Sequence, residues 1–157
     1  MARILMVCTA NICRSPMAQV VAAHHAKLAG LGRDTVVDAA GTYAGRISDA
    51  PDPRGTAALK KRGYVVGKTK SRRVTDNDFV RFDLILAMDQ ANLSALREAC
   101  PPEHSHKLRL FLEYAPQSGQ SEVPDPYYGG PDGFERVLDL CEAGAKGLVS
   151  ELRRAAA

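Results

Sequence analysis

The segment Ile4-Leu5-Met6-Val7-Cys8-Thr9-Ala10-Asn11-Ile12-Cys13-Arg14-Ser15-Pro16 decides the fold. The apolar run that opens it predicts a buried strand ending at Cys8. Ser15 is a typical N-cap and Pro16 suits the first helical position, so a helix is predicted to begin here and to run to Leu28. A short loop between a strand and a helix N-terminus directs backbone N–H groups and a helix dipole at one anion. The spacing C-x5-R-S therefore predicts a phosphate-binding loop.

The residue types in this loop indicate covalent chemistry on phosphorus. The Cys8 sulfur is placed to attack a bound phosphate, while the guanidinium fork of Arg14 binds two phosphate oxygens. The helix N-terminus, the loop amides, Arg14 and the Ser15 hydroxyl all favour the thiolate form of Cys8. The other residues expected to bind substrate are Thr9, Ala10, Asn11, Ile12, Cys13 and Ser15. The sequence thus predicts an enzyme that removes phosphate through a phosphocysteine.

A carboxyl group that can protonate the leaving oxygen is predicted at Asp125. Pro124 and Pro126 flank it and restrict the backbone, which would hold the carboxyl group at a fixed height above the loop. Tyr127 and Tyr128 follow directly and offer a flat wall for an aromatic leaving group.

Composition narrows the class of protein. A chain of 157 residues with 45% hydrophobic and 25% charged residues is typical of one globular domain, predicted as residues 1–157. No apolar run is long enough to span a bilayer and no secretory signal is evident, so a cytoplasmic location without membrane binding is expected. Secretion without a signal peptide stays open.

The net charge of +3 and the lack of interleaved aromatic residues argue against nucleic-acid binding. No cysteine or histidine has metal-ligand spacing, so no metal is expected.

The chain alternates predicted strands and helices, a pattern typical of a parallel α/β sheet flanked by helices. Ligands bind at the carboxyl ends of such strands, which is where Cys8 lies. The predicted strands are Ala2–Cys8, Thr35–Ala40, Leu84–Met88 and Leu108–Leu112. After the first helix, helices are predicted at Pro53–Arg62, Gln90–Ala99 and Phe134–Arg154, with a short one capped by Thr75 and Asp78, and residues 115–130 are predicted as a long loop.

Cys8–Pro16 together with Asp125–Gly129 resembles the low-molecular-weight protein tyrosine phosphatase family. The matches continue through Ala40-Gly41-Thr42, Asp52–Gly55, Phe82–Asp89 and Asn92-Leu93, and cover residues 2 to about 152. The resemblance implies a single-domain three-layer sandwich with a four-stranded parallel sheet of order 2-1-3-4. It also implies hydrolysis of phosphotyrosine in proteins, with release of phosphate. Cys8 would be the nucleophile, Arg14 the phosphate clamp and Asp125 the general acid and base, without a cofactor.

The resemblance assigns further roles around the loop. It implies that Asn11 braces the loop and that Ser15 steadies the leaving thiolate. It implies that Cys13 can form a protective disulfide with Cys8. In some members a partner tyrosine kinase phosphorylates the tyrosines that match Tyr127 and Tyr128. A monomer is the default expectation.

Three departures from the family pattern bear on the site. Ala10 stands where glycine is frequent, which costs about 1 kcal/mol if φ is positive there and nothing otherwise. Tyr43, followed by residues 45–46, stands where the family often has an aromatic pocket wall. The segment 69–73 lacks a histidine that braces the loop asparagine in some relatives.

Three alternative functions are weighed against this reading. Protein-arginine phosphatases share the fold, but Ile12 and Tyr127 argue for phosphotyrosine. Arsenate reductases need a cysteine pair near residues 80–90, where this chain has none. A non-catalytic phosphopeptide-binding module has no need of Cys8 and Asp125.

Overall fold

A computed structural model describes residues 1–43, 49–127 and 129–156. Within these residues four strands form one parallel sheet in the order β2-β1-β3-β4, which confirms the predicted order. Cys8 is paired with Gly41, so the ends of β1 and β2 lie side by side. The strands are β1 (Ala2–Cys8), β2 (Thr35–Gly41), β3 (Leu84–Ala87) and β4 (Leu108–Leu110).

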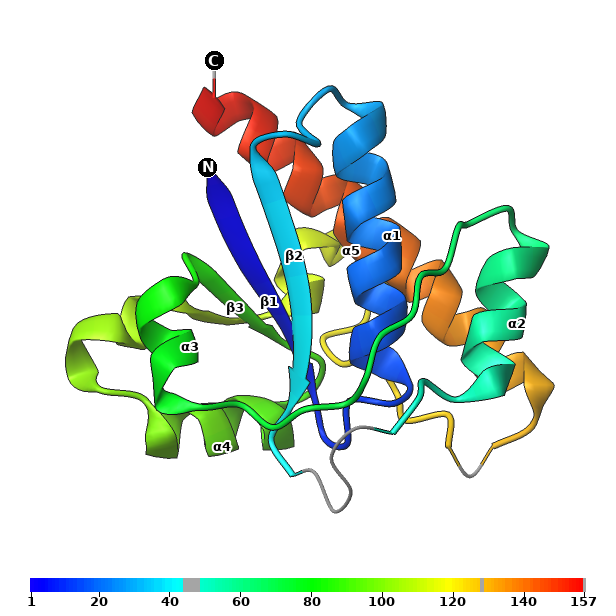
Figure 1. Cartoon of the computed structure of the whole chain (residues 1–157), viewed down its shortest axis with the longest axis horizontal. Helices are drawn as coiled ribbons and strands as arrows, with labels where there is room; N and C mark the ends of the chain where they lie inside the picture. The colour runs from blue at the N-terminus through cyan, green and yellow to red at the C-terminus, as the bar shows by residue number, and fades with distance from the viewer. Residues whose placement is uncertain (44–48, 128, 157) are drawn as a thin grey trace.

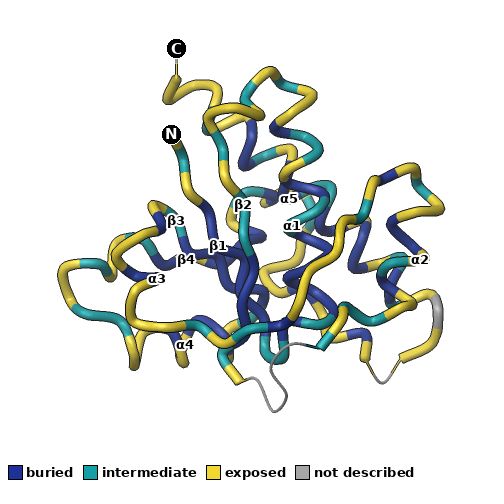
Figure 2. Tube along the Cα trace, in the orientation of Figure 1, coloured by how far each residue is buried: buried dark blue, intermediate teal, exposed yellow. Residues whose placement is uncertain are grey.

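Helices cover both faces of the sheet and make three layers (Figure 1). Side chains of β1 alternate between the layers: Ile4 and Met6 pack with the first group of helices, and Leu5 and Val7 with the second. Figure 2 shows that the buried residues concentrate along β1 and the helices that face it. The first group is α1 (Arg14–Leu28), α2 (Pro53–Lys61) and α5 (Pro131–Ala156), and the second is α3 (Asp76–Arg81) and α4 (Gln90–Ala99).

The start of α1 differs from the prediction. The helix begins at Arg14, so Cys13 occupies the N-cap position and Ser15 lies inside the first turn. Ser15 does not cap the helix because its hydroxyl lies against the sulfur of Cys8 and the amide of Asn11. Among the residues that the structure describes, no side chain caps this helix terminus, which leaves its first N–H groups directed at the loop.

The region around β4 also differs from the prediction. The strand ends at Leu110, and the chain turns into a 3₁₀ helix whose Glu113 carboxylate accepts a hydrogen bond from the Leu110 backbone N–H at 2.9 Å. That side-chain bond competes with continued strand pairing. The 3₁₀ helices are η1 (Pro102–Lys107), η2 (Phe111–Tyr114) and η3 (Pro116–Ser118), and η3 lies inside the predicted long loop.

The last helix is longer than predicted. α5 begins at Pro131, three residues before the predicted start at Phe134, and reaches Ala156. Proline lacks the N–H that a helix leaves unpaired in its first turn, so it suits this position.

In the described residues no helix is both long and apolar enough to cross a membrane.

Candidate active site

Cys8 ends β1 at the start of the loop that leads into α1. The residue is 3% exposed, and its Sγ lies 3.0 Å from the Oγ of Ser15. Gly41 of β2 approaches the loop so closely that a Cβ there would lie 2.5 Å from the carbonyl oxygen of Thr9. The backbone N–H of Thr42 donates to the carbonyl of Cys8 at 2.9 Å. The end of β2 therefore fixes the loop, and the close approach requires glycine at that position.

Arg14 is 2% exposed and is oriented by three hydrogen bonds. Its Nη1 donates to Asp89 Oδ2 at 2.6 Å and to the carbonyl of Val123 at 3.0 Å. Its Nη2 donates to Thr9 Oγ1 at 3.2 Å and lies 3.8 Å from Asp125 Oδ2. A guanidinium held on several sides keeps one geometry and can present its fork to a planar or tetrahedral anion.

Asp125 follows a short segment anchored to the end of β3, where the N–H of Val123 donates to the carbonyl of Met88 at 2.8 Å. Its Oδ1 accepts from the N–H of Tyr127 at 3.0 Å, and its side chain is 49% exposed. Together with the loop it borders a cavity of about 590 Å³. The residues that line this cavity are Cys8, Thr9, Ala10, Ile12, Cys13, Arg14, Tyr43, Asp49, Asp125 and Tyr127.

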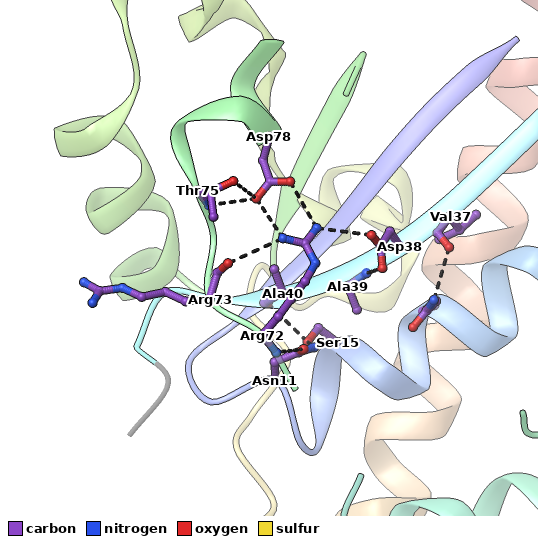
Figure 3. A network of polar contacts seen from close by, with 11 residues as sticks. Asn11, Ser15, Val37, Asp38, Ala39, Ala40, Arg72, Arg73, Thr75 and Asp78 are labelled. Atoms are coloured by element: carbon purple, nitrogen blue, oxygen red, sulfur yellow. Dashed lines mark hydrogen bonds and ion pairs between the residues drawn. The ribbon is translucent and has the colours of Figure 1, made fainter. Parts of the chain in front are cut away.

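Asn11 braces the loop from behind. Its φ is +59°, the one positive value among the described non-glycine residues, so the left-handed position is Asn11 and Ala10 carries no such strain. Its Nδ2 donates to Ser15 Oγ at 2.8 Å, and its Oδ1 accepts from the backbone N–H of Arg72 at 3.1 Å (Figure 3). That backbone N–H supplies a brace for the asparagine in a segment that has no histidine.

Comparisons with known proteins agree with this geometry. The model of the family described as "Low molecular weight phosphotyrosine protein phosphatase" matches residues 3–157. The chain belongs to this family. A low molecular weight protein-tyrosine-phosphatase of Streptomyces coelicolor is 42% identical, over 96% of this chain and 93% of that protein. A low molecular weight phosphotyrosine protein phosphatase of Schizosaccharomyces pombe is 43% identical, over 84% of this chain and 85% of that protein. A crystal structure of a protein tyrosine phosphatase from Entamoeba histolytica with Hepes in the active site superposes with a TM-score of 0.95, at 36% identity and 100% coverage of both chains.

The structure gathers most of the predicted site residues of this low molecular weight phosphatase around one cavity. Asn11 and Ser15 are the exceptions, because they are buried and hydrogen-bond to each other behind the loop rather than lining the cavity. Tyr128 lies outside the described residues, as do residues 45–46 of the expected wall. Tyr43 lines the cavity. In the described residues no group of three or more histidine, cysteine or acidic side chains could hold a metal ion.

Cys13 lies on the cavity wall as a buried thiol, and its Sγ is 4.0 Å from Asp52 Oδ2. Burial, the carboxylates of Asp52 and Asp125, and Cys8 together raise the pKa of Cys13 to about 12. Cys13 is therefore held as a neutral thiol, in contrast to what a nucleophile needs. The disulfide between Cys8 and Cys13 stays a prediction.

Three residues that contact the loop had no role in the sequence prediction. Asp89 caps α4 by accepting from the Asn92 N–H at 2.8 Å and also binds Arg14. Asn92 Nδ2 donates to Thr9 Oγ1 at 3.1 Å, while its Oδ1 is buried without a hydrogen-bond partner among the described residues. Arg72 holds Asn11 through its backbone. The positions of Asp89 and Asn92 could have indicated a role at the site. Both closely follow a buried strand, and the carboxyl end of that strand lies beside that of β1.

The Arg72 side chain anchors the segment that braces Asn11. Its guanidinium donates to both carboxylate oxygens of Asp78, at 2.9 and 3.0 Å, and to Asp38 Oδ2 at 3.1 Å (Figure 3). Asp78 also accepts from the Thr75 N–H at 2.8 Å, in the predicted capping arrangement of α3. Burial alone would raise the pKa of Asp78, but the hydrogen bonds from Arg72 and Thr75 outweigh it and hold that pKa below its ordinary value.

Replacing Arg72 by methionine is expected to lower the free energy of unfolding by about 2 kcal/mol at neutral pH. The loss lies below the roughly 3–5 kcal/mol of a fully buried pair, because the arginine side chain is 32% exposed while that of Asp78 is 2% exposed. Asp78 has a lowered folded pKa, so its contribution is present above its unfolded pKa of about 3.9 and is lost as the pH falls through the folded value. Urea unfolding of both proteins from pH 7 downward measures this. A difference that does not shrink in acid contradicts it.

Proposed function

We propose that this chain hydrolyses phosphotyrosine in proteins through a phosphocysteine intermediate. The observation that carries the proposal is the convergence of a cysteine sulfur, a buried arginine fork and a carboxyl group on one cavity, with Arg14 Nη2 at 3.8 Å from Asp125 Oδ2. The names of the relatives and of the matching structure describe enzymes that act on phosphotyrosine.

In the first step the Cys8 thiolate attacks phosphorus in line with the bond to the tyrosyl oxygen. A sulfur–phosphorus bond forms and the phosphorus–oxygen bond breaks, while Asp125 gives its proton to the departing phenolate. Arg14 and the loop N–H groups bind the three equatorial oxygens as their charge redistributes. The exposed side of Asp125 permits it to reach the leaving oxygen and to exchange protons with water.

In the second step water replaces the cysteine. The Asp125 carboxylate takes a proton from a water molecule whose oxygen attacks phosphorus, and the sulfur–phosphorus bond breaks with release of inorganic phosphate. The Ser15 hydroxyl, 3.0 Å from Cys8 Sγ, stabilises the leaving thiolate by a hydrogen bond. Asn11 keeps Ser15 in place, because its amide donates to the same hydroxyl oxygen at 2.8 Å.

Two exposed tyrosines on the cavity wall support an aromatic leaving group. Tyr43 is 66% exposed and Tyr127 is 42% exposed, so both rings can pack against a substrate ring that enters the cavity. Ile12 adds an apolar side chain to the same wall. Substrate-binding roles are assigned to Thr9, Ala10, Ile12, Cys13, Tyr127 and Tyr128, with Asn11 and Ser15 acting on the loop from behind.

Arsenate reduction through further cysteines is not supported by the places of Cys100 and Cys141. Cys100 follows the last residue of α4, whose ten residues extend about 15 Å from the end that faces the loop. Cys141 is fully buried in α5. Neither thiol lines the cavity that contains Cys8.

We assign the reaction to the cytoplasm. Its substrates are phosphotyrosine proteins, and the enzyme acts as a monomer. All four cysteines are free thiols, which suits a reducing compartment and an active Cys8. Tyr127 is accessible enough for a partner tyrosine kinase to modify it, and a phosphate there would place negative charge beside the cavity.

Phosphate release from matched peptides carrying phosphotyrosine, phosphoserine or phosphoarginine tests the proposal. Under reducing conditions we expect turnover of the phosphotyrosine peptide at least about 100-fold above the other two, because neither offers an aromatic leaving group to the tyrosine walls. Preferred turnover of phosphoarginine contradicts the assignment of substrate, and no turnover of any peptide contradicts the assignment of activity.

A further inference from the structure

Arg54, in the first turn of α2, joins two segments that are far apart in the sequence. Its Nε donates to Asp52 Oδ1 at 3.1 Å, and its Nη2 donates to Asp52 Oδ2 at 2.9 Å. The same Nη2 donates to the carbonyl oxygen of Tyr127 at 2.9 Å. Its guanidinium carbon lies 4.7 Å from the ring centre of Phe134 and 5.6 Å from that of Tyr127. One side chain thus binds the start of α2 and the segment that follows Asp125.

Stability alone is a poor account of this arrangement. The Arg54 side chain is 45% exposed, although that of its partner Asp52 is 9% exposed, so this pair contributes less to the free energy of folding than a fully buried pair would. The contacts are nevertheless specific in direction, because a bidentate fork fixes the guanidinium plane. The Arg54 side chain therefore has more effect on the position of the Tyr127 backbone than on the free energy of folding.

Two hydrogen bonds, with Tyr127 between them, lead from Arg54 to the acid. Tyr127 donates its N–H to Asp125 Oδ1 at 3.0 Å and accepts from Arg54 through its carbonyl oxygen at 2.9 Å. The residue that orients the carboxyl group is therefore itself held by Arg54. On the other side, Asp52 donates its backbone N–H to the carbonyl of Ile12 at 2.8 Å. The path Ile12–Asp52–Arg54–Tyr127–Asp125 joins the phosphate-binding loop to the acid.

We propose that Arg54 is a positioning residue that sets the place of the Asp125 carboxyl group relative to Cys8. The inference rests on the proposed function, since it gives Arg54 a role only if Asp125 protonates a leaving group. Proton transfer needs the donor within about 2.6–3.2 Å of the oxygen that it protonates, so a displaced Tyr127 backbone costs rate rather than fold.

Leaving-group dependence isolates this role. A nitrophenolate leaves readily without a proton, whereas the phenolate of tyrosine needs the acid. Because kcat/KM reports the steps up to phosphocysteine formation, it registers the acid step and not the later hydrolysis. Loss of a well-placed acid therefore lowers kcat/KM for a phosphotyrosine peptide much more than for 4-nitrophenyl phosphate.

The experiment compares Arg54→Met, Arg54→Lys, Asp125→Asn and the double variant Arg54→Met/Asp125→Asn. We expect Arg54→Met to lower kcat/KM about tenfold for the peptide, a fraction of the 10²–10⁴ that general acid catalysis supplies, and less than about twofold for 4-nitrophenyl phosphate. Arg54→Lys should recover part of the loss, because one ammonium can bind Asp52 or Tyr127 but has no fork for both. In the Asp125→Asn background, Arg54→Met should cause no further loss.

Arg62→Met is the matched control. Arg62 follows the last residue of the same helix and pairs with Glu135, Asp139 and Glu142 on α5 at 2.7–2.8 Å, away from the cavity. It should lower the thermal unfolding midpoint at least as much as Arg54→Met while leaving the ratio of the two substrates unchanged.

Two outcomes overturn the inference in distinguishable ways. If Arg54→Met lowers kcat/KM equally for both substrates, or its effect multiplies with that of Asp125→Asn, Arg54 does not act through the acid, although Cys8-dependent turnover would keep the proposed function. If the wild-type protein shows no Cys8-dependent turnover of either substrate, the proposed function fails and the role of Arg54 fails with it.

Discussion

Cys8→Ser is expected to lower the rate of phosphate release from a phosphotyrosine peptide by at least about 10⁴-fold, because removal of a catalytic nucleophile typically lowers the rate by this factor or more. The hydroxyl that replaces the thiol keeps the size of the side chain and its contact with Ser15, 3.0 Å away in the wild type. It does not ionise at neutral pH, and in the described part of the chain the hydrogen-bond partner of this position is the Ser15 hydroxyl, which is not a general base. The loss is therefore one of nucleophilicity and not of binding.

Two further measurements separate this loss from misfolding. The thermal unfolding midpoint of Cys8→Ser should stay within a few degrees of the wild type, and the variant should still bind inorganic phosphate. Cys100→Ser is the matched control, because Cys100 lies beyond the far end of α4. The activity of this variant should fall by less than about twofold. Retention of more than about a tenth of the wild-type rate by Cys8→Ser would show that another group attacks phosphorus.

The parts of this fold that could be predicted from the sequence are those governed by local patterns. The apolar run before Cys8 reads as a buried strand, and the structure has β1 buried on both faces. The pairing of Thr75 with Asp78 is a short-range capping signal, and it is present at the start of α3. Local propensity suffices to predict these elements, because it agrees with the structure that the whole chain adopts.

Ser15 shows where local reasoning failed. A serine before a proline is a good N-cap, but the hydroxyl here has two partners that only the folded chain supplies, Cys8 and Asn11. The helix therefore begins two residues earlier than predicted, at Arg14 instead of Pro16. A conflict between local preference and tertiary contact is expected at a site whose function needs an uncapped helix terminus.

The partners of Arg14 could not be predicted from spacing. Asp89 and Val123 come from other parts of the chain and meet the arginine only because β1 and β3 are neighbours in the sheet. The resemblance implied that β3 lies beside β1, but neither it nor the spacing indicated that the Asp89 carboxylate would bind Arg14. Arg54 was missed because its partner Tyr127 lies 73 residues further along the chain, and no local pattern joins the two.

Arg14→Lys is expected to lower kcat/KM for the phosphotyrosine peptide about 10³-fold, although the positive charge is kept. Loss of an arginine that stabilises a phosphoryl transition state typically costs 10³–10⁵ in rate. Lysine has one nitrogen, whereas Arg14 uses Nη1 for Asp89 and Val123 and Nη2 for Thr9 on the side nearest Asp125. An ammonium drawn to the Asp89 carboxylate cannot also bind two phosphate oxygens, so charge without the fork is insufficient.

The readout that distinguishes a lost fork from a lost charge is inhibition by inorganic phosphate. The lysine variant should bind the phosphate dianion only a few-fold more weakly, because the loop N–H groups and a nearby cation remain, while kcat falls by most of the 10³. Arg97→Lys, at an exposed position on α4, is the matched control and should change neither quantity. A variant Arg14→Lys that keeps kcat within tenfold of the wild type would show that the geometry imposed by Asp89 and Thr9 has no catalytic consequence. The opposite result would mean that the buried ion pair at 2.6 Å is retained because it aims the arginine fork at the transition state.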